Sequence, residues 1–318
     1  KGGSTMVIIE KVSRWGWENN IRMTNGTLEV IATTDVGPRV LHLSLVGERN
    51  IFRILEEECG RSGGDEWHIF GGHRLWHAPE ANPRSYCPDN HSVRFVPTAQ
   101  GGVFSQSVEP LTGIEKEMEI ILDLEGNHLT VLHRLTNRGV WPVELAPWAL
   151  SVMEQGGIAI IPQEPYQSWS ENLLPVRPLV LWGYTDMSDP RWRWGRKYVT
   201  LRQDPRSTSP NKAGFGNSLG WGAYLFEGYL FVKYAPRLPG MSYPDMGSSF
   251  EVYTDHRFLE LETLGPLVRL APQETVEHKE DWFLFKGVFC EDSDESIDTF
   301  VKPLVEKALE RIQGQVCR

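Results

Sequence analysis

Cysteine is scarce in this sequence, and its few occurrences follow no metal-binding pattern. The 318 residues include four cysteines, Cys59, Cys87, Cys290 and Cys317, with neither a CxxC spacing nor a zinc-ribbon pattern. We therefore expect free thiols in a reducing compartment, although the count also allows one or two disulfides. We predict no cofactor.

Long apolar runs and an excess of positive charge are also missing. No apolar run reaches roughly 18 residues, so no segment is expected to span a membrane. The formal net charge of −10 argues against nucleic acid and anionic membrane surfaces as partners. Tryptophan, with 12 residues, and proline, with 21, are abundant instead. Proline is typical of many loops, whereas tryptophan provides stacking surfaces for sugars and other ringed ligands.

The beginning of the sequence bears on the compartment. The residues KGGST resemble the remnant of an expression tag before a native start at Met6. The apolar run after Met6 is too short for a signal peptide, which favours a cytoplasmic protein. A secreted protein whose signal peptide had been replaced by a tag would begin in the same way.

Short alternating segments separated by turns dominate the chain. Asn25-Gly26 and Glu227-Gly228 each divide a pair of strand-like runs, as hairpin turns do. The only helical pattern is the amphipathic tail, where Pro303 should kink the helix or mark its restart. We predict an all-β fold: one large antiparallel β-sandwich domain over residues 7–290, after a tag-like start over 1–6. A C-terminal amphipathic helix and tail would follow over 291–318.

The stretch WHIFGGHRLWHAPE (residues 67–80) is the strongest candidate for a functional site. It places His73, Arg74 and His77 between tryptophans, directly after Gly71-Gly72, and its apolar residues fit neither a helical nor a strand period. A core rarely tolerates so many unpaired donors. We interpret the stretch as the wall of a polar-ligand pocket. The alternative is a buried polar network that ties loops together.

Two glutamates near the C-terminal end form a second candidate. Glu260 and Glu262 lie two residues apart in the strand-like run FLELET and should share one face. Both cannot comfortably stay ionised in a dry cleft, so one of them should be solvated or bridged by a cation such as Arg74 or Lys233. The pKa of the other should then rise toward neutral pH.

Several phrases of the sequence resemble the galactose mutarotase (aldose 1-epimerase) superfamily. They are GGHRLWHAPE, APWAL, KYAPRLPGMSYPDMG and LELETLGPL, and the resemblance runs from about Trp17 to Phe285. It implies a galactose mutarotase-like supersandwich, and it implies that Glu262 of the Leu-Glu-Thr strand is a catalytic base. Two histidines of the family are replaced, one by Phe70 before the Gly-Gly pair and the other by Trp148.

The chemistry that the resemblance implies is exchange of sugar anomers. A base takes the anomeric hydroxyl proton and an acid protonates the ring oxygen. We assign Glu262 as the base and His73 as the acid, on a cleft that both would line. The expected substrate-binding residues either hold hydroxyls or stack on the ring; they are Arg74, Trp76, Glu80, Trp148, Lys233, Asp245 and Glu251. Taken alone, Asp245 is better explained as a turn residue.

Other functions remain open at this point. A carbohydrate-binding module would use the same cleft without turnover. A lyase or hydrolase would use Glu80, Glu260 and Glu262 to cleave a glycoside or uronide. A metal site is not predicted, because His68, His73, His77 and Glu80 have no standard zinc spacing. The expected partner is a small carbohydrate.

Overall fold

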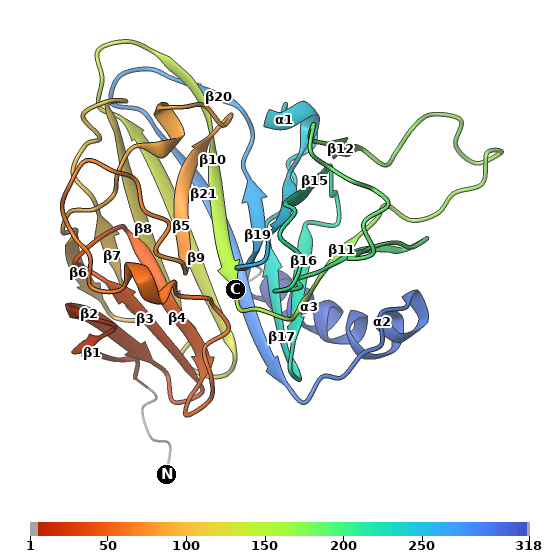
Figure 1. Ribbon diagram of the computed structural model, residues 1–318, viewed down its shortest axis with the longest axis horizontal. Helices are drawn as coiled ribbons and strands as arrows, with labels where there is room; N and C mark the ends of the chain where they lie inside the picture. Colours follow the sequence, from red (N-terminus) through yellow and green to blue (C-terminus); the bar gives the residue numbers. More distant parts are fainter. Residues whose placement is uncertain (1–5, 317–318) are drawn as a thin grey trace.

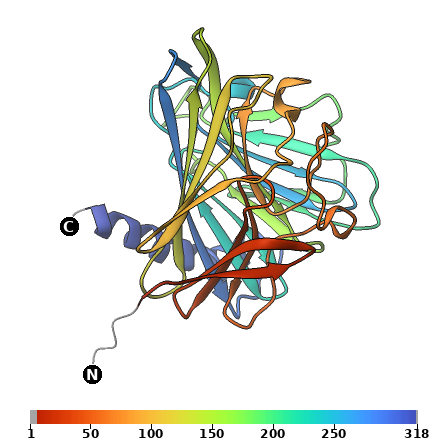
Figure 2. The same ribbon diagram turned by 90° about the vertical axis from the view of Figure 1, so that its left-hand side faces the viewer.

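The structure, a computed structural model, describes residues 6–316 and consists of two large antiparallel sheets packed face to face (Figures 1 and 2). This arrangement confirms the predicted all-β sandwich. The tag-like residues 1–5 and Cys317 lie outside the described residues.

The first sheet has 11 strands and carries the site described below. Asn25-Gly26 lies between β2 and β3, which pair as the predicted hairpin. In spatial order the strands are β1 (Ile8–Arg14), β2 (Trp17–Thr24), β3 (Leu28–Thr33), β4 (Arg39–Leu45), β5 (His73–Ala78), β10 (Val143–Met153), β19 (Leu259–Leu264), β18 (Phe250–Thr254), β15 (Asn211–Phe215) and β12 (Leu179–Leu181), with β20 (Val268–Leu270) also paired to β10.

The second sheet has 10 strands. Glu227-Gly228 joins β16 to β17, again as predicted. In spatial order the strands are β13 (Trp192–Trp194), β14 (Tyr198–Arg202), β11 (Ile158–Pro162), β16 (Trp221–Phe226), β17 (Tyr229–Tyr234), β21 (Thr275–Lys286), β9 (His128–Asn137), β8 (Ile114–Leu122), β7 (Gly101–Ser105) and β6 (Arg94–Thr98).

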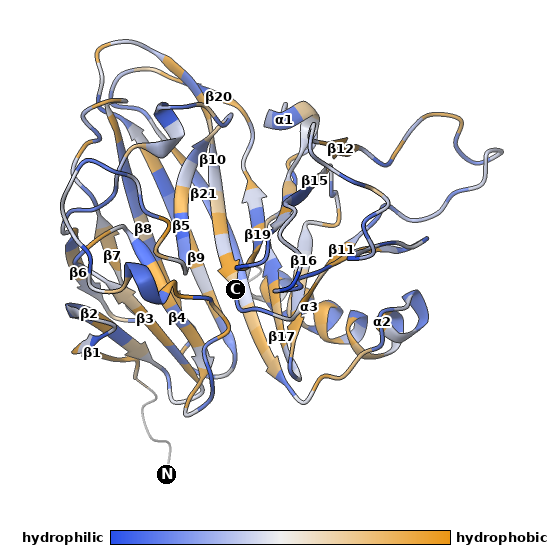
Figure 3. Cartoon of the chain, in the orientation of Figure 1, coloured by the Kyte–Doolittle hydropathy of each residue, from blue (hydrophilic) through white to orange (hydrophobic). Residues whose placement is uncertain are grey.

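Apolar side chains from both sheets fill the space between them. The main core cluster includes Met23 and Phe250 from the first sheet and Phe104, Phe231 and Trp282 from the second. Figure 3 shows the hydrophobic colouring concentrated on strands such as β17. Because successive side chains of a strand point to opposite faces, the strand register fixes which side chains face this core and which face outward.

The C-terminal tail forms two helices, α2 (Asp294–Phe300) and α3 (Lys302–Val316), that cover the outer face of the second sheet. Ser293 caps α2 by accepting a hydrogen bond from the amide of Ser296. The helix restarts next to Pro303, as predicted, because proline is tolerated in a first turn. In the rest of residues 6–316 the helices are short turns: η1 (Glu56–Glu58), η2 (Arg84–Tyr86) and α1 (Pro244–Gly247).

A search of the helices within residues 6–316 finds none that is both long and apolar enough to cross a membrane.

Candidate functional site

Strand pairing assembles the candidate site across the first sheet. Arg74 on β5 pairs with Leu150 on β10, which pairs with Glu262 on β19, which pairs with Glu251 on β18. Directly paired residues point to the same side of a sheet. The row therefore presents Arg74 and both carboxylates on the face that is turned away from the second sheet.

The Gly71-Gly72 pair sets the beginning of β5. Both residues have positive φ, 95° and 69°, which glycine adopts without steric cost. A Cβ on Gly71 would lie 2.2 Å from the carbonyl oxygen of Arg53, and one on Gly72 would lie 2.2 Å from that of Val40. The glycines thus let the chain turn against two neighbouring segments and enter the sheet with Arg74 facing outward.

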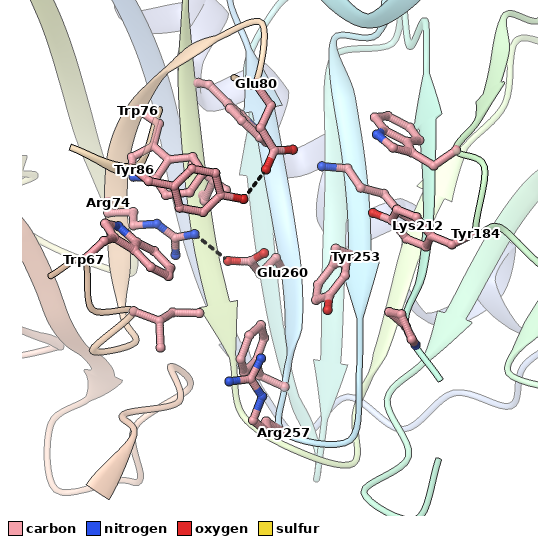
Figure 4. A pocket seen from close by; sticks show the side chains of 16 residues that line it. Trp67, Arg74, Trp76, Glu80, Tyr86, Tyr184, Lys212, Tyr253, Arg257 and Glu260 are labelled. Carbon is pink, nitrogen blue, oxygen red and sulfur yellow. Dashed lines mark hydrogen bonds and ion pairs between the residues drawn. The ribbon is translucent and has the colours of Figure 1, made fainter. Parts of the chain in front are cut away.

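A cleft of about 460 Å³ lies on this outer face (Figure 4). In Figure 4, Trp67, Trp76 and Tyr86 form one side, Tyr184 and Lys212 form the other, and Glu260 lies between them. The remaining lining residues are mainly aromatic or charged; they are Ile69, Arg74, Glu80, Trp148, Leu150, Trp182, Pro210, Tyr253, Arg257 and Phe258.

Lys212 is buried at the floor of the cleft between two carboxylates and two indole rings. Its Nζ lies 2.7 Å from Glu251 Oε2 and 3.0 Å from Glu262 Oε2. The same ammonium lies 4.8 Å from the ring centroids of both Trp148 and Trp182. Trp148 also donates its Nε1 hydrogen to Glu262 Oε2 at 2.8 Å. We call Lys212, Glu251, Glu262 and Trp148 the floor cluster.

The charges of the floor cluster are coupled. Burial disfavours the charged form of Lys212, but Glu251 and Glu262 outweigh this effect and hold the pKa of Lys212 well above its ordinary value. Burial raises the pKa of Glu251 well above its ordinary value, opposed by Lys212 and reinforced by the charge of Glu262. A proton on Glu251 leaves one buried cation beside one buried anion, Lys212 beside Glu262.

Glu260 does not belong to the floor cluster; its side chain lines the cleft directly. Its Oε1 lies 2.9 Å from Arg74 Nη2, and the Arg74 guanidinium lies 4.7 Å from the centre of the Trp76 ring. Burial raises the pKa of Glu260, while Arg74 opposes the rise and the charge of Glu262 adds to it. The sequence predicted a cation on one of the two glutamates and a raised pKa on the other. Instead, each has a cation, Arg74 on Glu260 and Lys212 on Glu262, and the raised pKa belongs to Glu260 despite its pairing with Arg74.

The prediction that His73 and Glu262 line one cavity is wrong. His73 neighbours Arg74 on β5 and therefore points to the opposite face, into the space between the sheets. There its Nε2 lies 2.7 Å from His133 Nε2, and its Nδ1 lies 2.8 Å from Ser151 Oγ. His73 is fully buried and separated from the cleft by the sheet, so it cannot act as the acid partner of Glu262 in this arrangement.

His73 and His133 form a linear chain of hydrogen bonds between the sheets, from Ser151 to the backbone carbonyl of His278. His133 donates from Nδ1 to the carbonyl of His278 at 3.0 Å, which leaves its Nε2 to accept from His73. His73 in turn accepts from the Ser151 hydroxyl. Burial lowers the pKa of His73, His133 and His278, and that of His278 falls to about 3. His73 therefore belongs to a buried polar network, which was the alternative interpretation of the stretch 67–80.

Lys233 is also misplaced by the sequence prediction. It lies on β17 of the second sheet, is fully buried, and contacts Glu280 Oε1 at 3.0 Å. Its Nζ also donates to the carbonyl of Leu261 at 3.1 Å. Lys233 therefore links the two sheets from inside and does not reach a ligand in the cleft.

A metal-like group of donors occurs within the same interior. Donor atoms of His73, His133 and Glu280 all lie within 4.8 Å of one another. The two histidine nitrogens are 2.7 Å apart, whereas two nitrogen ligands of a tetrahedral zinc ion lie roughly 3.3 Å apart. The observed separation fits a shared proton better than a shared ion. The residues first considered for a metal are not together, because His68 contacts Glu58 and His77 contacts Glu109.

The other predicted binding residues occupy different positions. Trp76, Trp148, Arg74 and Glu80 line the cleft, and Glu80 accepts a hydrogen bond from the hydroxyl of Tyr86. Glu251 and Glu262 are fully buried beneath Lys212 and Trp148, so neither touches the cleft directly. Asp245 is half-buried in the turn α1, with φ of 49°, and is not among the lining residues.

Sequence reasoning missed much of the wall opposite β5. Trp182 and Tyr184 follow the short strand β12 in a proline-rich region that gives no clear periodicity. Lys212 stands in β15, although its surroundings resemble a polar connection. Tyr253 could have been found, because it alternates with Glu251 on one strand face.

Comparison with known proteins identifies the fold. No protein-family model matches the sequence, and no curated protein matches it. Several solved structures match over nearly their whole length. The protein Slr1438 from Synechocystis sp. PCC 6803 has a TM-score of 0.57 and 10% identity, covering 87% of this chain and 99% of that one.

Two further matches are galactose mutarotase-like proteins. A galactose mutarotase-like protein from Clostridium acetobutylicum has a TM-score of 0.55 and 11% identity, over 88% of this chain and 99% of that one. Another from Lactobacillus casei has a TM-score of 0.54 and 10% identity, over 84% of this chain and all of that one. The fold of this chain is therefore galactose mutarotase-like.

The buried histidines make the stability of the fold depend on pH. The pKa of folded His278 is about 3, well below its ordinary value of 6.5, so between these values only the unfolded chain binds the proton. Its contribution to stability is complete above pH 6.5 and is lost as the pH falls. For His278 alone, we expect a loss of about 2 kcal/mol between pH 7 and pH 5.

The measurement is urea unfolding at both pH values, with His278→Gln compared with wild type. The variant should lose about 2 kcal/mol less than wild type over this interval. His256→Gln, at an exposed histidine, should keep the wild-type pH dependence. The comparison is needed because the raised pKa values of Glu251 and Glu260 act in the opposite direction. Equal pH dependence in His278→Gln and wild type would contradict the assignment.

Proposed function

We propose that the cleft on the outer face of the first sheet binds a carbohydrate. The observation that carries this proposal is the combination of indole and phenol rings with charged hydrogen-bonding groups around one cavity of about 460 Å³. Sugar rings present an apolar face that stacks on aromatic side chains and a rim of hydroxyls that need polar partners. Trp67 and Trp76 supply the first requirement, and Glu80 and Glu260 the second.

The fold supports the same proposal. The matched structures include galactose mutarotase-like proteins. Part of the cleft is lined here by Arg74, Trp76 and Glu260, which lie in two of the phrases on which the sequence resemblance rests. Fold likeness alone does not define an activity. The function is therefore argued from the side chains of the cleft.

Removal of one stacking ring tests the binding proposal. Trp67→Ala should weaken saccharide binding roughly tenfold, because one ring face of the cleft is lost. Isothermal titration calorimetry against a panel of mono- and oligosaccharides measures the change. Trp169→Ala is the matched control, since Trp169 is 80% exposed and lies outside the cleft. Unchanged binding in Trp67→Ala, or equal loss in both variants, would argue against this site.

Turnover of the aldose 1-epimerase type is the second candidate function. The resemblance assigns the base to Glu262, which Trp148 and Lys212 separate from the cleft. The observation that favours catalysis is its neighbour Glu260, which lines the cleft and has a raised pKa. We propose Glu260 as the group that exchanges a proton with the sugar, with Glu262 reaching it only if Lys212 moves away.

No cleft histidine supplies the complementary acid. Of the described residues that line the cavity, none is a histidine, and the pKa values of Tyr184 and Tyr253 are raised by burial. This arrangement favours binding over anomer exchange. Cleavage of a glycoside by Glu80 together with Glu260 or Glu262 would be a different reaction, detectable as the release of new reducing ends.

A pair of isosteric variants separates these possibilities. Glu260→Gln should lower anomer exchange about a hundredfold or more while saccharide binding persists, if the protein turns over its ligand. Glu262→Gln should reduce exchange much less. Polarimetry of a freshly dissolved sugar measures the rate. Loss of exchange only in Glu262→Gln would restore Glu262 as the base, and no catalysed exchange in wild type would leave binding as the function.

A further inference from the structure

The cations of the cleft are already neutralised by the protein. Arg74 contacts Glu260 at 2.9 Å, Arg257 contacts Asp255 at 2.8 Å, and Lys212 is held by both Glu251 and Glu262. Each cation that lines the described cleft therefore has at least one carboxylate of its own. A phosphate, sulfate or carboxylate group of a ligand would have to displace one of these carboxylates.

The remaining charge disfavours an anionic ligand further. Glu80 lines the cleft, is exposed, and contacts the neutral hydroxyl of Tyr86. Since Glu260 is already paired with Arg74, the carboxylate that adds charge beside the aromatic side formed by Trp76 and Tyr86 is that of Glu80. Like charges that are brought together at a binding site oppose association and are one way in which a site rejects wrong ligands.

The aromatic groups occupy two separate walls. The first wall comprises Trp67, Trp76 and Tyr86, whose ring centroids lie between 5.1 and 5.5 Å apart. The second wall comprises Tyr184 and Tyr253, which stand on the other side of Glu260 in Figure 4. Trp67 and Tyr86 on the first wall, and Tyr184 and Tyr253 on the second, are partly exposed, so each wall leaves ring surface for a sugar.

The volume of the cavity is large enough for more than one sugar unit. Cavities of roughly 300–1,000 Å³ enclose drug-sized ligands, and a single pyranose is much smaller than such a ligand. The 460 Å³ of this cleft is therefore more than a lone sugar ring fills. A second sugar unit would fill the rest and stack on the other wall.

We infer that the cleft takes a neutral carbohydrate of at least two sugar units, one stacked on each aromatic wall, in preference to a monosaccharide, a sugar phosphate or a uronate. This inference rests on the proposed carbohydrate-binding function and narrows its substrate class. Neutralised cations determine the preference for uncharged sugars, and the two walls determine the preference for length.

The test is calorimetric titration with a defined set of saccharides. The neutral probes are galactotriose, mannotriose, cellotriose and maltotriose, each with its monosaccharide; the acidic probes are trigalacturonate and glucose 6-phosphate. A neutral trisaccharide should bind roughly three- to tenfold more tightly than its monosaccharide, because a second stacking contact is added. Both acidic probes should bind more weakly than that trisaccharide, and higher salt should leave its affinity nearly unchanged.

A variant of the second wall tests the length preference directly. Tyr184→Ala should reduce the ratio of trisaccharide to monosaccharide affinity toward one. Tyr184 is 44% exposed, so its removal should leave the fold intact. Tyr166→Ala is the matched control, since Tyr166 is 62% exposed and lies outside the cleft, and it should keep the wild-type ratio.

The outcomes separate this inference from the proposed function. Equal affinity for a monosaccharide and its trimer, or tighter binding of an acidic probe, would overturn the inference while carbohydrate binding stood. Binding of no saccharide in the set would overturn both. A preserved affinity ratio in Tyr184→Ala would overturn the assignment of the second sugar unit to this wall.

Discussion

The buried ammonium of Lys212 is the interaction on which the floor of the cleft depends. Its Nζ lies 3.0 Å from Glu262 Oε2 and 2.7 Å from Glu251 Oε2. It also lies between the rings of Trp148 and Trp182. Two carboxylates directly opposite each other on β18 and β19 would repel if both were ionised and unpaired. The ammonium of Lys212 between them, together with the raised pKa of Glu251, allows these strands to stay paired beneath the aromatic lining.

Alternate side chains of β5 lie on opposite faces of the first sheet and therefore in two different environments. His73 and His77 point into the dry interior, where neutral imidazoles link the sheets, while Arg74 and Trp76 line the cleft. The two interpretations of the Trp67–Glu80 stretch are therefore each true of alternate residues. This division also removes the acid that would have accompanied Glu262 and leaves a cleft whose polar groups are mainly carboxylates and phenols.

Much of the fold could be predicted from the sequence, because hairpin turns, alternation and the amphipathic tail are local signals. The placement of Arg74, Trp76 and Trp148 followed from the same stretch and the resemblance. The errors arose where position depended on strand register: one residue separates an inward His73 from an outward Arg74, and Lys233 belongs to the other sheet. Lys212 and Tyr184 could not be assigned, since only the pairing of β15 and the course of β12 bring them to the cleft.

Lys212 thus stabilises the cleft floor by neutralising buried Glu262. The most direct measurement is the free energy of unfolding of Lys212→Met and of the double variant Lys212→Met/Glu262→Gln, by denaturant titration at neutral pH. The single variant should lose about 3–5 kcal/mol, because a buried carboxylate is left without its cation. The double variant should recover a substantial part of that loss. A single variant as stable as wild type, or a double variant less stable than the single one, would contradict the account.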